Sequence, residues 1–298
     1  MRCRLLPCRT QRIRTTVRFT EFAPAKINLA LHVLGRRAGG LHEIDSIVAF
    51  ADVGDELRFE PTPEFAIAAS GPFARLLPLL EDNIITKAYR KVAAIAAARH
   101  KILPPVTVHL TKNLPISAGI GGGSADAAAA MRGFLRLAEI EGVDSEIEQA
   151  ALSLGADVPV CLMGKACRMQ GVGERIVPLE NFKPLHAVLV NPRIAVQTPA
   201  VFQKLGLAEG ERRGTSLTDL SDPAAWRNDL TLPAVALVPA IAGVIAVLEN
   251  QQDVRFARMS GSGATCFGVF EKPDAAREAA RAISALHPQW WVQQAILG

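Results

Sequence analysis

The chain of 298 residues is long enough for about two domains, and its 49% hydrophobic and 21% charged residues are typical of a globular protein. Six arginines precede the first acidic residue, Glu21, so the formal net charge of +4 belongs to the N-terminus; the remainder, at about −2, does not predict a nucleic-acid-binding face. The sequence contains no apolar run of about 18 residues, which argues against a transmembrane helix.

Neither the N-terminal segment nor the cysteines indicate a particular catalytic or binding site. Residues 1–20 are basic and contain no acid, and we predict that they form a disordered extension; a transit peptide is the alternative. The five cysteines are odd in number and none forms a Cys-x-x-Cys pair, so neither a zinc site nor a disulfide framework is predicted. Reduced thiols in a cytoplasmic protein are the expected state.

The pattern of the first half predicts strands and helices in mixed order. Apolar residues that alternate with polar ones predict strands over 25–34, 41–50, 56–60 and 105–111. A helix is predicted over 82–99, with Asp82 as its N-cap. Further helices are predicted over 124–139 and 145–154, followed by short strands over 166–169 and 175–179.

The pattern changes near residue 180, which predicts two domains, 21–179 and 180–298. In the second half we expect strands over 186–191, a strand pair within 254–270, a final strand over 289–296, helices over 233–249 and 273–286, and loops across 206–225. Because strands and helices mix without strict alternation, the predicted fold class is α+β and not a doubly wound sheet.

A glycine cluster, Gly119–Gly123 in PISAGIGGGSADAAAA, stands between a predicted strand and a predicted alanine-rich helix. Glycines let successive backbone N–H groups face one concavity, and a helix N-terminus adds to the attraction for anions. The cluster therefore predicts a phosphate site, with a plain tight turn as the alternative. The Walker and dinucleotide motifs do not match. Valine at Gly122 is expected to fill the space that the phosphate needs.

Three other features have ordinary interpretations when each is taken alone. Lys26, in PAKINL, could be a solvated lysine at a strand edge, and Asp157, in GADVP, could be a turn aspartate. The segment SGSGAT, residues 260–265, could be a hairpin turn. Their occurrence together with the glycine cluster favours a nucleotide-dependent enzyme.

PAKINL, PISAGIGGGSADAAAA, GADVPV and SGSGAT together resemble the GHMP small-molecule kinases, over residues 21–298. PAKINLALHVLGRRAGGLHEIDSI, EDNII, GADVPVCLMGKACRMQGVGE and TPAVF are similar to the members that act on 4-diphosphocytidyl-2-C-methyl-D-erythritol in the non-mevalonate route to isoprenoid precursors. The resemblance implies a domain like ribosomal protein S5 followed by a ferredoxin-like domain. It also implies ATP with Mg2+ and phosphorylation of the acceptor's 2-hydroxyl. We expect a monomer or homodimer without a nucleic-acid or membrane partner.

The resemblance also assigns residues. It implies that Lys26 and Asp157 are catalytic, and that Ser124, which could otherwise cap its helix, reaches Mg2+. Asn28, His42 and Phe202 match positions that contact the cytidine part of the acceptor. The positions implied to hold ATP are Asn83, near adenine, and Pro115, Ile116, Ser117, Ala118, Gly119, Ile120, Gly121, Gly122, Gly123, Ser124 and Ala125. Leu41 departs from the pattern, because a tyrosine usually stacks on cytosine there.

Several alternatives stay open at this point. The chain could be another kinase of the superfamily, acting on homoserine, a mevalonate or a sugar, or a nucleotide-binding module without transferase activity. A nucleic-acid binder is a third alternative, disfavoured by charge. Gly171–Gly173 is interpreted as a turn lining the acceptor site, Asn228–Asp229 as a helix cap, and Trp290–Trp291 as core packing.

Overall fold

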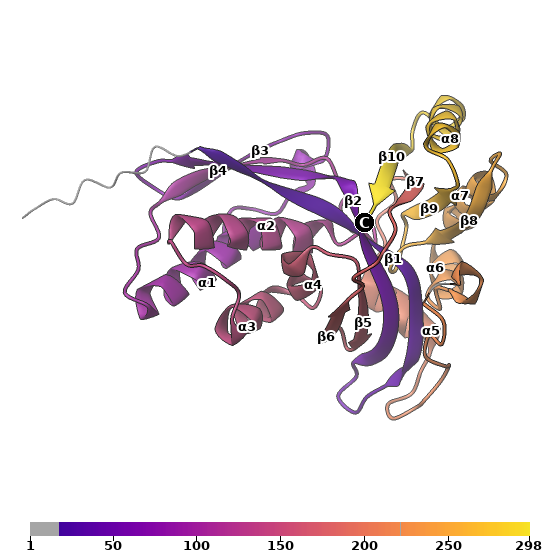
Figure 1. Cartoon of the computed structure of the whole chain (residues 1–298), viewed down its shortest axis with the longest axis horizontal. Helices are drawn as coiled ribbons and strands as arrows, with labels where there is room; N and C mark the ends of the chain where they lie inside the picture. The colour runs from indigo at the N-terminus through magenta and orange to yellow at the C-terminus, as the bar shows by residue number, and fades with distance from the viewer. Residues whose placement is uncertain (1–17, 221) are drawn as a thin grey trace, which may run out of the picture.

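The computed structural model describes residues 18–220 and 222–298, so the predictions for Cys3, Cys8 and most of the basic extension lie outside the described residues. The chain forms two parts, each a sheet with helices packed on it (Figure 1). The strands of the first part are β1 (Phe19–Arg36), β2 (His42–Pro61), β3 (Ala66–Ser70), β4 (Val106–Thr111), β5 (Cys167–Gly171) and β6 (Arg175–Pro178). Its helices are α1 (Ile84–Ala98), α2 (Gly122–Leu137), α3 (Ser145–Leu154) and α4 (Val158–Met163), with a 3-10 turn at Ala74–Leu76.

The second part has β7 (Leu185–Asn191), β8 (Val254–Met259), β9 (Cys266–Phe270) and β10 (Trp291–Leu297). Its helices are α5 (Thr198–Leu205), α6 (Thr231–Leu237), α7 (Ala240–Glu249) and α8 (Pro273–Leu286), with a 3-10 turn at Pro223–Ala225. These strands lie in the order β10-β7-β9-β8, and β10 joins the first sheet where Leu297 pairs with Ala51 of β2. The predicted mixture of α and β elements is confirmed, and the predicted boundary after residue 179 falls between β6 and β7.

The long hairpin of β1 and β2 organises the first part, because β2 pairs with β1, β4 and β5. The separate strands predicted over 41–50 and 56–60 are one continuous strand. β1 is longer than predicted and carries register shifts between Pro24 and Lys26, and between Asn28 and Ala30. Such bulges re-aim side chains. They occur where β1 carries the residues singled out from the sequence.

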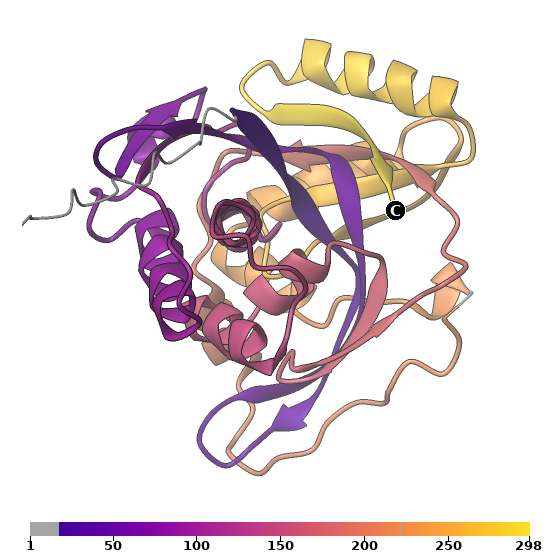
Figure 2. The same ribbon diagram turned by 60° about the vertical axis from the view of Figure 1, so that its left-hand side comes forward.

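Helix α2 is the central helix of the first part, and Figure 2 shows it nearly end-on, with the sheet and the other helices around it. Ala127–Ala130 are fully buried. A side chain on Gly133 would collide with the ring of Phe59 in β2, so the absence of bulk lets the helix lie close to the sheet. The alanines therefore form the face of α2 that packs closely in the core.

Several local predictions need correction. Helix α1 is capped by Asn83, whose side chain accepts a hydrogen bond from the N–H of Ile85, and not by Asp82. Helix α2 begins two residues earlier than predicted, and its N-cap is Gly121, not Ser124. The helix predicted over 233–249 is two helices, because Val238 and Pro239 separate α6 from α7. Helices α4 and α5 and strand β3 were not predicted.

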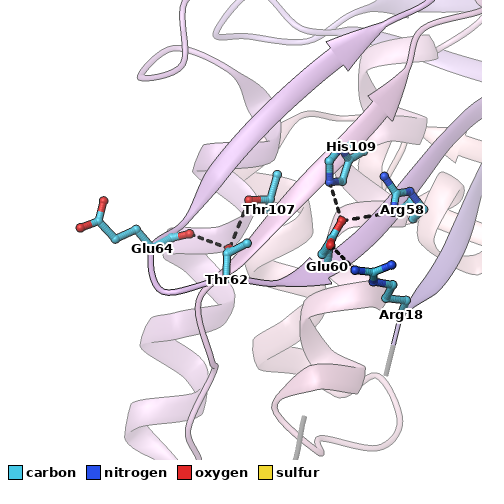
Figure 3. A network of polar contacts seen from close by, with 7 residues as sticks. All are labelled: Arg18, Arg58, Glu60, Thr62, Glu64, Thr107 and His109. Atoms are coloured by element: carbon cyan, nitrogen blue, oxygen red, sulfur yellow. Dashed lines mark hydrogen bonds and ion pairs between the residues drawn. The ribbon is translucent and has the colours of Figure 1, made fainter. Parts of the chain in front are cut away.

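The sheet of the first part carries a polar network on and beside β2 and β4, drawn in Figure 3, that includes none of the residues lining the site described below. Glu60 accepts hydrogen bonds from Arg18, Arg58 and His109. Thr107 donates to Thr62 at 3.2 Å. Exposed ion pairs of this kind contribute roughly 0–1 kcal/mol each to the stability of the folded protein, so this network does not determine the fold.

The tryptophans, the lengths of the helices and the cysteines bear on three further predictions. Trp291 is buried in the core, as predicted, and the adjacent Trp290 is partly buried against the core while its ring stacks on His287. Within residues 18–220 and 222–298, no helix combines the length and apolar character needed to cross a membrane. Cys161, Cys167 and Cys266 are free and buried. Burial raises the pKa of the Cys167 thiol to about 11, which suits an unreactive reduced cysteine.

Candidate active site

A cleft of about 1450 Å³ lies between the two parts of the chain and receives residues from both. From the first part, Lys26, Asn28, His42, Asn83, Asp157 and most of the glycine loop line it. From the second part, Phe202, Gly261 and Ser262 line it. Ile120 and Ala125, also named from the sequence, do not line the cleft, because their side chains are buried in the core. The structure thus brings the other sequence-predicted residues to one cavity.

Lys26 and Asp157 form an ion pair in this cleft. The Lys26 Nζ lies 2.9 Å from Asp157 Oδ2, and the exposed fractions of the two side chains are 5% and 36%. Asp157 stands at the N-cap position of α4, but its side chain makes no capping hydrogen bond. Its carboxylate pairs with Lys26 in the cleft instead of bonding to its own helix. A nearly buried ammonium thus holds a carboxylate that solvent and ligands can reach.

The glycine loop is attached to β1 next to that lysine. The N–H of Lys26 donates to the carbonyl of Ile120 at 2.9 Å. Gly121 has φ 62°, and a Cβ on it would lie 3.2 Å from Lys26 Cβ and 3.3 Å from Lys26 Cε. Glycine is therefore needed at 121 both for its left-handed backbone and for the passage of the lysine side chain.

The N-terminus of α2 follows directly and opens toward the cleft at Gly123. A Cβ on Gly123 would meet nothing within 4 Å. At Gly122, by contrast, a Cβ would lie 3.4 Å from Lys112 Nζ and 3.6 Å from Leu114 Cβ. The sequence-based expectation that valine at 122 fills the phosphate space stays a prediction, and the structure adds that its side chain would contact the buried Lys112 and Leu114.

A buried charge cluster beneath the loop was missed by the sequence analysis. Lys112 Nζ lies 2.5 Å from Asp55 and 2.6 Å from Asp126, and all three side chains are buried. Asp55 also accepts hydrogen bonds from the N–H groups of Asn113 and Leu114. Burial, together with the neighbouring Asp55 and against the attraction of Lys112, raises the pKa of Asp126 to about 8. The one available signal was an aspartate within an otherwise apolar alanine helix.

The other end of the cleft carries an aromatic pair. His42 stacks on Phe202 with ring centroids 4.4 Å apart and an interplanar angle of 29°. Burial, with the charge of Arg36, lowers the pKa of His42, so its ring is neutral at pH 7. His42 Nε2 is buried and has no partner within the described chain. Leu41, which is 61% exposed, lines the same end.

Two asparagines combine structural bonds with a position in the cleft. Asn28 donates to Ser46 Oγ at 2.8 Å, while its Oδ1 lacks a partner among residues 18–220 and 222–298. Asn83 lines the cleft and also caps α1. In the turn at Gly171–Gly173, Val172 lines the cleft, in agreement with the interpretation of that turn. Asn28 thus keeps its Oδ1 available to a ligand.

The second small-residue loop, SGSGAT, is not a simple hairpin turn. Ser260 Oγ accepts a hydrogen bond from the N–H of Asn28 and donates one to the carbonyl of Gly119, each at 3.0 Å. The N–H of Thr265 donates to the carbonyl of Ala118 at 3.0 Å. This loop of the second part thus packs on the glycine loop of the first part and helps fix its shape.

Comparison with protein families gives two matches. The model described as "GHMP kinases N terminal domain" matches residues 83–165, which include the glycine loop and Asp157. The model described as "GHMP kinases C terminal" matches residues 214–289, which include the SGSGAT loop.

Similar proteins carry a more specific name. A protein of Roseobacter denitrificans named 4-diphosphocytidyl-2-C-methyl-D-erythritol kinase is 46% identical over 289 residues, covering 93% of both chains. One of Cereibacter sphaeroides with the same name is 47% identical over 282 residues, covering 92% of this chain and 97% of its own.

Solved structures agree on the fold. A crystal structure of 4-(cytidine 5'-diphospho)-2C-methyl-D-erythritol kinase superposes with a TM-score of 0.78 at 33% identity, covering 94% of this chain and 99% of the other. A homoserine kinase of Cytophaga hutchinsonii superposes with a TM-score of 0.67 at 16% identity, over 93% and 94% of the two chains, which shows a shared fold alone.

Proposed function

Since this chain belongs to the 4-diphosphocytidyl-2-C-methyl-D-erythritol kinases of the GHMP superfamily, we propose that it transfers the γ-phosphoryl group of ATP to the 2-hydroxyl of that cytidine-bearing alcohol. Its product would be the 2-phosphate, an intermediate of the non-mevalonate route to isoprenoid precursors. The Lys26–Asp157 ion pair carries the proposal, because it lies in one cleft with the glycine loop and the His42–Phe202 pair.

The proposed reaction is a direct in-line transfer. The acceptor's oxygen forms a bond to the γ-phosphorus while the bond from that phosphorus to the bridging oxygen of ADP breaks. Such transfers pass through a loose transition state, so positioning and charge stabilisation supply most of the catalysis. Asp157 orients the hydroxyl and accepts its proton as the new bond forms. Lys26 holds Asp157 in place and offsets negative charge near the transferred group.

The nucleotide is proposed to lie along residues 115–125. The N–H groups at the start of α2 face the cleft at Gly123 and favour phosphate oxygens, since a helix N-terminus carries partial positive charge. Asn83 is placed near the adenine by the same proposal. Ile120 and Ala125 contribute backbone and packing, because their side chains are buried.

Mg2+ is proposed to accompany ATP. Within the described ranges, no three His, Cys, Asp or Glu residues form a group that could hold a metal ion. Mg2+ bound to phosphates needs only one or two protein oxygens, because waters and the phosphates supply the rest. Ser124, which lines the cleft in the first turn of α2 and does not cap it, fits that requirement. The ion would neutralise phosphate charge.

The cytidine part of the acceptor is proposed to lie at the His42–Phe202 end. His42 Nε2 and Asn28 Oδ1, which lack a hydrogen-bond partner in the part of the chain that the structure describes, are polar atoms that a bound ligand can satisfy. Phe202 offers a ring face, and Leu41 offers an apolar cover without a π face. Discrimination from homoserine and mevalonate, which lack a base, would come from these residues.

The proposal extends to the setting of the enzyme. We place it in the cytoplasm as a monomer or homodimer, acting on a free small molecule without a nucleic-acid or membrane partner. The first domain would span 21–179 and the second 180–298, with the cleft between them.

One assay tests the proposed function. Purified protein with ATP and Mg2+ is offered the cytidine-bearing alcohol, homoserine or mevalonate in separate reactions, and ADP release is measured. We expect ADP release only with the cytidine-bearing alcohol. Equal or greater release with homoserine or mevalonate would assign the chain to another reaction of the superfamily.

A further inference from the structure

The segment Arg227–Asp229 runs beside β1, which is the strand that carries Lys26 and Asn28. The N–H of Leu31 donates to the carbonyl of Arg227 at 2.8 Å, and the N–H of Asp229 donates to the carbonyl of Leu31 at 2.9 Å. The side chain of Asp229 accepts the N–H of Val33 at 2.8 Å. The second part of the chain is thus hydrogen-bonded to β1 a short distance along the strand from Lys26.

Asn228, in the middle of this segment, bonds to the SGSGAT loop. Its Nδ2 donates to the carbonyl of Met259 at 2.7 Å and to that of Gly261 at 2.8 Å. Its Oδ1 accepts the N–H of Leu230 at 2.9 Å. The sequence-based interpretation as a helix cap is wrong, because Leu230 is the N-cap of α6 and no side chain caps that helix.

The contact continues from Gly261 to the glycine loop. A Cβ on Gly261 would lie 2.6 Å from the carbonyl oxygen of Gly119, so the two backbones touch. Ser260, next in the same loop, donates to that carbonyl at 3.0 Å. Asn228 itself does not line the cleft, whereas Gly119 and Gly261 do. A side chain outside the cleft therefore supports the loop proposed to hold the phosphates.

We infer that Asn228 is a positioning residue for the nucleotide: its amide holds Ser260 and Gly261 against Gly119, which keeps the backbone N–H groups of the glycine loop aimed at the phosphates. The inference rests on the proposed function in that residues 115–125 hold ATP. Aspartate at 228 has the same shape as asparagine but no N–H donors, so it would set a carboxylate against the carbonyls of Met259 and Gly261.

The test compares Asn228→Asp with the wild type by titration calorimetry with Mg2+ and a non-hydrolysable ATP analogue, and by steady-state kinetics. Loss of hydrogen bonds to buried carbonyls is expected to weaken nucleotide binding about tenfold or more. The KM for the acceptor at saturating ATP is expected to stay within about twofold, because the His42–Phe202 end is untouched. A general loss of packing would change both constants.

Asn250→Asp is the matched control. Its exposed amide donates to the carbonyl of Ala246 at the end of α7, so the same chemical change occurs away from the glycine loop. Its nucleotide affinity should equal that of the wild type. Ser260→Ala supplies a second route, because it removes the hydrogen bond to Gly119, together with the one from the N–H of Asn28, while leaving Asn228 in place.

The double variant decides whether the two residues act together. If Asn228 works through the Ser260–Gly261 loop, the combined loss of affinity will be smaller than the product of the single losses. Wild-type nucleotide affinity in a folded Asn228→Asp protein would overturn the inference, as would independent, multiplicative effects of the two substitutions. Should Asn228→Asp fail to fold, wild-type affinity in Ser260→Ala would overturn it. A wild type that binds nucleotide but does not phosphorylate the alcohol would remove the proposed function and leave this inference intact.

Discussion

The side chain of Lys26 crosses the face of Gly121, where a Cβ would come within 3.2 Å of Lys26 Cβ. This crossing joins two features that are far apart in the sequence, the lysine of β1 and the glycine loop before α2. The lysine then reaches Asp157 with its Nζ 2.9 Å from the carboxylate. The loop proposed to hold phosphate and the pair proposed to ready the hydroxyl are thus one packed unit.

Asp157→Asn is expected to lower kcat by at least ~100-fold, the scale of a lost general base. The affinity for ATP should change little, because the glycine loop stays intact. Steady-state kinetics and nucleotide titration measure the two quantities. The exposed Asp274→Asn, which undergoes the same change on α8, serves as the control. Near-normal turnover of the Asp157 variant would remove this residue from the mechanism.

Gly123→Val is expected to weaken nucleotide binding more than about tenfold without lowering the melting temperature, because the new side chain enters open space in front of the helix N-terminus. Gly243→Val, at an exposed position of α7 where a Cβ also meets nothing within 4 Å, is the matched control. Unchanged affinity in Gly123→Val would show that the phosphates bind elsewhere.

Gly122→Val tests the packing around the neighbouring glycine. Its side chain would press on Lys112 and Leu114, so the expected result is a lower melting temperature. Thermal unfolding of this variant beside Gly123→Val separates the two effects. A Gly122 variant of wild-type stability would contradict the placement of that side chain.

Asp126→Asn is expected to change how stability depends on pH. Burial and the neighbouring Asp55 raise the pKa of Asp126 in the folded protein well above that of the unfolded carboxyl, so this group makes stability fall as pH rises between the two pKa values. The neutral amide removes that dependence. Urea unfolding at pH 5 and pH 8 should therefore show a smaller fall for Asp126→Asn than for the wild type. Equal falls would mean that Asp126 is ionised in the folded protein.

Leu41→Tyr is expected to lower the KM for the cytidine-bearing acceptor by about two- to tenfold, since a base stacked on an aromatic ring gains ~0.5–1.5 kcal/mol beyond burial. Leu41 is largely exposed at the cleft, so the larger ring can be accommodated. Leu41→Ala should raise the same KM by removing the apolar cover. An acceptor KM unchanged in both variants would place the base away from this residue.

Local signals predicted some elements well. The helices over 145–154 and 273–286 have the predicted bounds, because Asp144 caps the first and Pro273 opens the second. Strand lengths were predicted poorly. The hairpin of β1 and β2 continues past Pro24 and Gly54 because pairing with neighbouring strands, which local sequence does not encode, decides where a strand ends.

Some residues of the candidate site could likewise be predicted from the sequence, whereas others could not. Lys26 and Asp157 stood out because they occur together with the glycine cluster in one chain, although each is ordinary when taken alone, and the structure brings them to one cleft. The roles given to them remain predictions. The Lys112–Asp55–Asp126 cluster was missed because its three residues come from separate segments, and Asp126 in the alanine helix was the one local signal of it. Asn228 was misjudged because its partners lie about 30 residues away in the chain.

The most direct test of the central claim is a crystal structure of the protein with Mg2+, a non-hydrolysable ATP analogue and the cytidine-bearing alcohol. We predict that the β- and γ-phosphates contact the N–H groups of the loop around Gly119–Gly123, and that the acceptor's 2-hydroxyl contacts Asp157 beside Lys26. A triphosphate away from residues 115–125, or a hydroxyl out of reach of both charged groups, would contradict the account.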